Sequence, residues 1–108
     1  MRGIPARARD HQETHIAIDL DHVLRALAHP DRRTFVIACR DQPRAAGELA
    51  DLSALSLATV SEHLKVLRTA GLLVLDKQGR NWFYRTDPAV LAAAISGLGN
   101  LRRGPVSS

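Results

Sequence analysis

Apolar residues recur at helical spacing in the first half of the chain. From about residue 13 to residue 29 they lie three or four positions apart: Ile16, Leu20, Val23, Leu24 and Leu27. This spacing places them on one face of a helix. Because Pro30 disfavours helical backbone at the residue before it and Asp31 can open a new segment, a second helix is predicted over residues 31–40. Its apolar positions, which we expect to be buried, are Phe35, Val36 and Cys39.

The middle of the chain predicts two further helices. A short one covers residues 45–52, and a longer one begins at Ser56, whose hydroxyl can accept hydrogen bonds from the free amides of the first turn. The apolar positions of the longer helix lie three or four apart and are predicted to face the core: Leu57, Val60, Leu64 and Leu67. Its other side is polar, and Gly71 can adopt the left-handed backbone that ends a helix.

Two strands and a last helix complete the pattern. The strands are predicted over residues 72–76 and 82–86, joined by a loop in which Gly79 can take the positive φ of a hairpin turn. Asp87 can cap a last helix that has Pro88 at its first position and runs to about residue 98. Three glycines predict that this helix frays at its end: Gly97, Gly99 and Gly104.

These elements predict one small domain that is mainly α with a β-hairpin wing, comprising about five helices and two strands. A chain of 108 residues is long enough for one buried core but not for two. We expect a flexible arm over residues 1–12, the folded domain over residues 13–98 and a flexible tail over residues 99–108. Two short helices with a tight link, followed by a hairpin, are typical of a winged helix-turn-helix.

Composition excludes several classes of protein. Apolar residues make up 45% of the chain and charged residues 24%, as in a soluble globular protein. The longest apolar runs are far shorter than the roughly 18 residues that span a bilayer, so we expect no membrane segment and a cytoplasmic location. Cys39 is the single cysteine, which excludes an internal disulfide and a thiolate zinc site, so we expect it to be a small core residue.

The distribution of charge indicates a polyanionic partner. The formal net charge is +4, and residues 56–86 hold only two acidic residues, Glu62 and Asp76. The same stretch holds five basic residues: Lys65, Arg68, Lys77, Arg80 and Arg85. Nucleic acid is the simplest polyanion for such a surface, although many basic proteins bind none.

The helix that begins at Ser56 has the side chains that major-groove recognition requires. The groove admits one α-helix, while the preceding helix lies across the DNA backbone and the hairpin reaches phosphates or the minor groove beside it. The positions predicted to face outward are short or polar: Ala58, Thr59, Ser61, Glu62, His63 and Lys65. Hydroxyls donate or accept at base edges, a glutamate accepts from cytosine, and His63 or Lys65 can contact bases or phosphates. The alternative is a polar face that contacts only water.

Four segments resemble a known family. They are LRALAHPDRR over residues 24–33, ELA over 48–50, SLATVSEHLKVLRTAGL over 56–72 and GRNWFYR over 79–85. Over about residues 20–98 the chain resembles the ArsR/SmtB family of bacterial winged-helix repressors. The resemblance implies a homodimer, built mainly from the first and last helices. Such a dimer places two recognition helices in successive major grooves of a near-palindromic operator in double-stranded DNA.

The same resemblance implies which residues contact DNA. On the recognition helix these are Ser56, Thr59, Ser61, Glu62, His63 and Lys65. On the wing they are Lys77, Gln78 and Arg80. One departure from the family is Ala54, which stands where glycine is common in the turn between the two helices, so the geometry of that turn is left open.

Two metal sites that are common in the family are missing from this sequence. The thiolate pair falls on Ala45 and Gly47, and the last helix, over residues 88–98, has no histidine, acid or cysteine. If the first helix extends back to residue 11, four other residues share one stripe: His11, His15, Asp19 and His22. Imidazole and carboxylate groups at that spacing can converge on Ni(II), Zn(II) or Co(II). The alternative is a polar helix start in a regulator without a metal effector.

The sequence therefore predicts a sequence-specific, DNA-binding transcriptional regulator. It is a repressor or an activator according to where its operator lies, and a response to nickel or zinc is left open. The alternative is a winged-helix module that binds another protein without specific DNA binding. An enzyme is disfavoured, because the chain shows no nucleophile and base pair and no glycine-rich phosphate loop.

Overall fold

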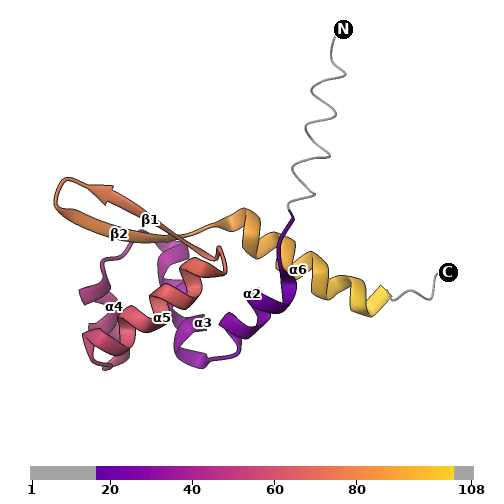
Figure 1. Cartoon of the computed structure of the whole chain (residues 1–108), viewed down its shortest axis with the longest axis horizontal. Helices are drawn as coiled ribbons and strands as arrows, with labels where there is room; N and C mark the ends of the chain where they lie inside the picture. Colours follow the sequence, from indigo (N-terminus) through magenta and orange to yellow (C-terminus); the bar gives the residue numbers. More distant parts are fainter. Residues whose placement is uncertain (1–16, 104–108) are drawn as a thin grey trace, which may run out of the picture.

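The computed structural model describes residues 17–103 (Figure 1). Its elements are α2 (Leu20–Leu27), α3 (Pro30–Asp41), α4 (Ala46–Ser53), α5 (Leu57–Thr69), β1 (Leu73–Gln78), β2 (Asn81–Thr86) and α6 (Pro88–Arg103). Helices α2 to α5 form the body, and the hairpin and α6 leave it in opposite directions (Figure 1). Within the described residues this is the expected arrangement of five helices and a two-stranded wing, so the predicted winged helix-turn-helix is confirmed.

The first described helix begins later than its apolar pattern predicts. Residues 17–19 are not helical, and α2 begins at Leu20. Asp19 has extended backbone, and its Oδ1 accepts a hydrogen bond from the backbone N–H of His22 at 3.1 Å. An N-cap of this kind satisfies one of the free amides of the first turn, so Asp19 starts the helix instead of lying inside it. The prediction that residues 17–19 are helical is therefore wrong, and the part of the predicted helix before residue 17 lies outside the described residues.

The break between α2 and α3 lies where Pro30 predicts it, but its cap is different. Pro30 is the first residue of α3, and His29 is the N-cap with an extended backbone. Nδ1 of His29 accepts from the backbone N–H of Asp31 at 3.2 Å. The prediction that Asp31 opens the segment is therefore wrong, because the imidazole two residues earlier already performs this function.

Two arginines of α3 hold the end of α2. The last carbonyls of a helix lack partners within the helix. Nη1 of Arg33 donates to the carbonyl of Leu27 at 2.7 Å, and Nη1 of Arg32 lies 3.4 Å from the carbonyls of both Arg25 and Ala26. The short helix α2 is thus fixed against α3 by charge-assisted hydrogen bonds as well as by packing.

The apolar core gathers around α5. Its largest fully buried side chains are Phe35, Leu49, Leu64, Leu67, Leu72, Val23, Val60 and Cys39. Three of the four apolar positions predicted to face inward on α5 are buried, but Leu57 is 56% exposed. Leu57 is the first residue of α5, and the core does not extend beneath that turn. Its prediction as a core residue is therefore wrong.

The wing is an antiparallel hairpin with a two-residue turn. Its register runs from Leu73 opposite Thr86 to Gln78 opposite Asn81, so the strands reach further toward the tip than predicted. Gly79 has φ 65° in the turn, as expected. At the base, Thr86 Oγ1 donates to the carbonyl of Val36 at 2.7 Å in the buried interior. This bond attaches the wing to α3.

A short bridge, which the sequence pattern does not predict, also holds the wing. The backbone of Arg44, between α3 and α4, pairs with that of Tyr84 through two hydrogen bonds of 3.0 and 2.7 Å. The Arg44 guanidinium donates from Nε to the carbonyl of Ala38 at 3.1 Å. The segment that leads into α4 is therefore tied to both α3 and β2.

Helix α6 is longer than predicted. Asp87 Oδ1 accepts from the backbone N–H of Ala89 at 3.0 Å, which confirms it as the cap, but the helix continues to Arg103. The fraying expected from Gly97 onward is absent among the described residues. A Cβ at Gly97 would lie 3.1 Å from a methyl carbon of Leu20, so Gly97 allows α6 to cross α2 closely. No helix of the described part is long and apolar enough to cross a membrane.

Candidate nucleic-acid interface

The turn between α4 and α5 is built by side chains that bond to nearby backbone. Ser53 Oγ donates to the carbonyl of Leu49 at 2.8 Å near the end of α4. Ala54 then takes a left-handed conformation, with φ 60° and ψ 24°. Ser56 caps α5 by accepting from the backbone N–H of Thr59 at 3.1 Å, and its hydroxyl donates to Thr59 Oγ1 at 3.0 Å. The predicted cap at Ser56 is confirmed.

The outer side of α5 is exposed over its first three turns. The exposed residues are Leu57, Ala58, Thr59, Ser61, Glu62 and Lys65, and Ser56 is exposed just before them. Four residues on the opposite side are buried: Val60, His63, Leu64 and Leu67. The helix therefore offers two hydroxyls, a carboxylate and an ammonium group to a partner. These side chains are accessible, as predicted, while their contacts with DNA stay a prediction.

His63 does not belong to that outer side. Only 8% of its surface is exposed, and its ring lies 6.1 Å, centroid to centroid, from Phe35. It follows Val60 by three residues and precedes Leu67 by four, which is the spacing of the buried side. The prediction that it faces outward is therefore wrong. The spacing of apolar residues in the sequence already places position 63 on the buried side, although His63 is polar.

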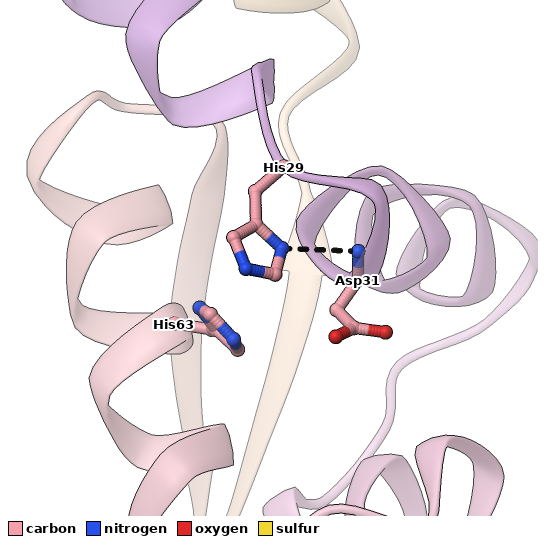
Figure 2. A group of neighbouring side chains, drawn as sticks. All are labelled: His29, Asp31 and His63. Carbon is pink, nitrogen blue, oxygen red and sulfur yellow. Dashed lines mark hydrogen bonds between the residues drawn. The ribbon is translucent and has the colours of Figure 1, made fainter.

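His63 belongs instead to a cluster at the junction of α5 with the link between α2 and α3 (Figure 2). Nε of Arg32 donates to Nδ1 of His63 at 3.2 Å, and the rings of His29 and His63 lie 4.4 Å apart, centroid to centroid. Asp31 lies on the other side of the same space (Figure 2). Because Arg32 also reaches the last carbonyls of α2, one guanidinium connects α2 to the recognition helix. No pattern in the sequence indicates this role for Arg32.

Burial and neighbouring charge keep the His63 imidazole neutral. Burial lowers the pKa of His63 below its usual value, and the nearby His29 and Arg32 lower this pKa further. Asp31 and Glu62 oppose the effect more weakly. A proton on Nδ1 would also remove the acceptor that Arg32 uses. A neutral His63 is therefore the form that the surrounding groups stabilise.

His29, Asp31 and His63 bring three possible metal ligands within 4.8 Å of one another. The groups around them do not suit a metal. Each Nδ1 already accepts from an N–H donor, the backbone of Asp31 for His29 and the Arg32 guanidinium for His63. The ring proton of each imidazole therefore lies on Nε2. A metal at Nε2 would need that proton moved to Nδ1, against the donors. The cluster is therefore a hydrogen-bonded structural joint.

The structure describes only two of the four residues in the other candidate metal set. Asp19 and His22 form the capped start of α2, while His11 and His15 lie outside the described residues. A continuous helical stripe through all four is not found, because residues 17–19 are not helical. Metal binding by His11, His15, Asp19 and His22 stays a prediction that can no longer rest on one straight helix.

The wing carries its basic residues at the tip. Lys77, Gln78 and Arg80 are exposed at the end of the hairpin, as predicted. Arg85 lies nearer the base and pairs with Asp76 at 3.1 Å, which offsets its charge. Lys77 Nζ lies 4.5 Å from the centroid of the Trp82 ring. The excess positive charge of the wing is thus concentrated where the hairpin is furthest from the body.

Cys39 has the structural role expected from the sequence. It is fully buried, and burial raises the pKa of its thiol to about 12 although Arg44 opposes the shift. A thiol with such a pKa carries almost no thiolate at neutral pH and reacts slowly. The expectation that Cys39 is a small core residue is confirmed.

Comparisons with known proteins agree with this architecture. A family profile described as a helix-turn-helix domain matches residues 27–76. The HTH-type transcriptional regulator Rv2034 of Mycobacterium tuberculosis is 42% identical over 78 residues, which cover 72% of this chain and 73% of that protein. The HTH-type transcriptional repressor SmtB of the same organism is 40% identical over 73 residues, which cover 68% of this chain. The matched part spans only 54% of SmtB, about half its length.

A solved structure gives the same result for the fold. The homodimeric winged helix-turn-helix DNA-binding domain of a Mycobacterium bovis protein, described as a possible ArsR-family transcriptional regulator, superposes with a TM-score of 0.63. It is 25% identical, and the match covers 74% of this chain and 77% of that domain. This solved structure shares the winged helix-turn-helix fold described above. The chain belongs to the ArsR/SmtB family of winged helix-turn-helix transcriptional regulators.

Proposed function

We propose that the chain is a sequence-specific DNA-binding transcriptional regulator that works in the cytoplasm as a homodimer on a near-palindromic operator. The observation that carries this proposal is that α5 has one buried apolar side and one exposed polar side. Its inner side is buried in the core, and its outer side offers Thr59, Ser61, Glu62 and Lys65. The capped N-terminus of α5 and the basic wing tip supply the remaining donors for phosphate and base edges.

The residues divide into two roles. Lys65 and the wing residues Lys77 and Arg80 carry charge on long, exposed side chains, which suits them to phosphates. Phosphate contacts strengthen binding to every DNA sequence equally. Ser61 and Glu62 carry short polar groups near the start of α5, the part of a recognition helix that meets base edges. The exposed Leu57 adds an apolar group that suits the methyl of thymine. We assign base reading to this second group.

Self-association is proposed from α6. Its outer side exposes three large apolar residues, Ile95 at 61%, Leu98 at 43% and Leu101 at 75%. A row of apolar side chains on an exposed helix usually marks a contact surface. The related Mycobacterium bovis domain is homodimeric, and a second copy of this chain would cover the same row. Two copies would then present two α5 helices to one duplex.

The proposal is tested by selecting duplexes from a random library with the full chain and measuring affinity by anisotropy of labelled DNA. Affinity should fall steeply between about 50 and 200 mM salt, because phosphate contacts release counterions. Lys77→Ala or Arg80→Ala should each lower the salt slope by roughly one unit on every sequence. Ser61→Ala should change base preference instead. Arg40→Ala removes an exposed charge that pairs with Asp41 on α3, and serves as the control.

Two other results would change the proposal. A chain that enriches no duplex, and whose partner binding is insensitive to salt, would be a protein-interaction module. If Lys77→Ala and Arg80→Ala altered only base preference, the assignment of the wing to phosphates would be wrong.

A response to nickel or zinc requires a separate experiment. Titration of either metal into the full chain should give binding that His15→Ala weakens, if the histidine set at the start of the chain is the site. His63→Gln should leave that binding unchanged, because the hydrogen-bonded cluster does not suit a metal. Weak binding that neither variant changes would leave a regulator without a metal effector.

A further inference from the structure

Trp82 is an exposed tryptophan at the wing. Half of its surface is exposed, and it is the single tryptophan of the chain. Tryptophan is enriched at interfaces, because it offers a large apolar surface together with one N–H donor. The three other aromatic residues are buried or half-buried. Half of the surface of Trp82 is therefore accessible to a partner.

The strand register shows which way the ring faces. Lys77 and Trp82 are direct cross-strand partners, and Leu73 and Thr86 are the partners at the other end of the hairpin. Side chains two residues apart share one face of a strand, so all four lie on the same face. That face is buried at the base, where Leu73 and Thr86 are 3% and 4% exposed. At the tip the same face extends past the body and is open.

The Lys77 ammonium is held against the open ring. Its Nζ lies 4.5 Å from the ring centroid, within the range of a cation and π attraction. A lysine held in this way loses less side-chain freedom when it meets a phosphate. The indole itself offers an apolar face and one N–H donor. Together the pair offers a positive charge, a hydrogen-bond donor and an apolar surface within one small area.

We propose that Trp82 contacts the sugar and phosphate backbone of duplex DNA beside the groove that α5 occupies, and positions Lys77 for the adjacent phosphate. The inference rests on the proposed function. Deoxyribose presents C–H groups to the ring face, and the phosphate accepts from the indole N–H and from Lys77. Arg80 in the turn adds a second positive charge at the tip, which favours a polyanion. Arg85, nearer the base, adds little because its charge is offset by the ion pair with Asp76.

The single tryptophan makes the test direct. The full chain is titrated with the tightest duplex from the selection, while anisotropy of the labelled DNA and tryptophan emission are recorded on matched samples. At saturation, quenching of Trp82 emission by acrylamide should fall at least about twofold, because the DNA backbone covers the ring and excludes water from it. A change in anisotropy without any change in emission or acrylamide access would overturn the inference alone. No change in anisotropy would overturn the proposed function and the inference with it.

A double-mutant cycle tests the coupling of Trp82 to Lys77. Trp82→Leu should lower affinity roughly tenfold, as truncation of an interface tryptophan often does, and Trp82→Phe, which keeps a ring without the N–H, should lower it less. Lys77→Ala should cost clearly less affinity in the Trp82→Leu background than in the wild type, because its ammonium is no longer positioned. The midpoint of thermal unfolding should be unchanged in all three, since Trp82 and Lys77 are exposed.

Three results would contradict the proposed role of Trp82. Additive losses would mean that Trp82 does not position Lys77. An unchanged affinity in Trp82→Leu would remove the DNA contact altogether. Acrylamide protection that rises with protein concentration in the absence of DNA would assign the ring to a protein contact instead.

Discussion

The outer side of α5 and the outer side of α6 are both exposed helix faces, but their chemistry is opposite. The α5 face carries Thr59, Ser61, Glu62 and Lys65, and the basic wing stands beside it. The α6 face carries Ile95, Leu98 and Leu101. Neither face is covered by the part of the chain that the structure describes, and the groups on each face indicate which kind of partner would cover it. A polyanion fits the first face, and a second apolar surface fits the second.

This difference predicts opposite responses to salt. Phosphate contacts release counterions, so binding at the α5 face weakens as salt rises. Apolar burial at the α6 face does not depend on counterions, and salts such as sulfate strengthen it. High sulfate should therefore separate the chain from DNA while its copies remain associated. The predictions that follow are ways to separate the two faces further.

The largest effect is expected inside α5. Leu64 is 1% exposed, so Leu64→Asp places a charge without a partner in the core and should cost on the order of 5 kcal/mol. That is comparable to the whole stability of a small domain, so the chain should be unfolded by far-ultraviolet circular dichroism. The matched variant Ser61→Asp, on the exposed side, should stay folded and lose DNA binding by repelling phosphate. Two folded variants would show that α5 is not packed as described.

The next effect concerns α6. Ile95→Glu combined with Leu98→Glu should leave the chain folded but monomeric in sedimentation, because both side chains are exposed within one subunit. Affinity for a palindromic duplex should fall by at least about tenfold, because the two half-sites are no longer bound as one unit. Lys65→Ala should show the reverse, with an intact dimer and weakened DNA binding. A double variant that still dimerises would place the self-contact elsewhere.

The two faces also differ in how far the sequence predicts them. The polar outer side of α5 follows from residue type and spacing, and Ser56 is recognisable as a cap from its hydroxyl alone. The sequence does not predict that the apolar row on α6 reaches Leu101, because Gly97 and Gly99 indicate a frayed end, whereas Gly97 lies where α6 crosses Leu20. A close approach between helices distant in sequence leaves no local pattern.

His63 and Leu57 show the same limit from the other direction. Each was assigned to a side of α5 by its polarity, and each lies on the other side. His63 is buried because Arg32, about thirty residues earlier in the chain, donates to its ring, and the ring of His29 packs against it. Leu57 is exposed because the core ends before the first turn of α5. Polarity predicts burial only where the tertiary partners are also known.

The third prediction is a pH dependence confined to the α5 end. The pKa of His63 is lowered in the folded chain, so below about pH 6.5 the unfolded state binds more protons at this residue. The free energy of unfolding in urea should therefore be fully kept above that pH and decline as the pH falls below it. His63→Gln should remove part of the decline, while His22→Gln, outside the cluster, should keep it. Equal declines in all three proteins would mean that His63 is not responsible.

The smallest effect is expected at the turn before α5. Ala54 has φ 60°, which costs an alanine about 1 kcal/mol or more, while glycine adopts it freely. Glycine also adds disorder to the unfolded chain, so Ala54→Gly should raise the free energy of unfolding by roughly 0.5 kcal/mol. The same change at the exposed, mid-helix Ala92 of α6 should lower it by about 1 kcal/mol, because glycine disfavours helical backbone. If the free energy of unfolding rises for Ala54→Gly and falls for Ala92→Gly, the turn at Ala54 carries strain. DNA affinity should be unchanged in Ala54→Gly, because glycine adopts the same turn geometry without strain and α5 keeps its position.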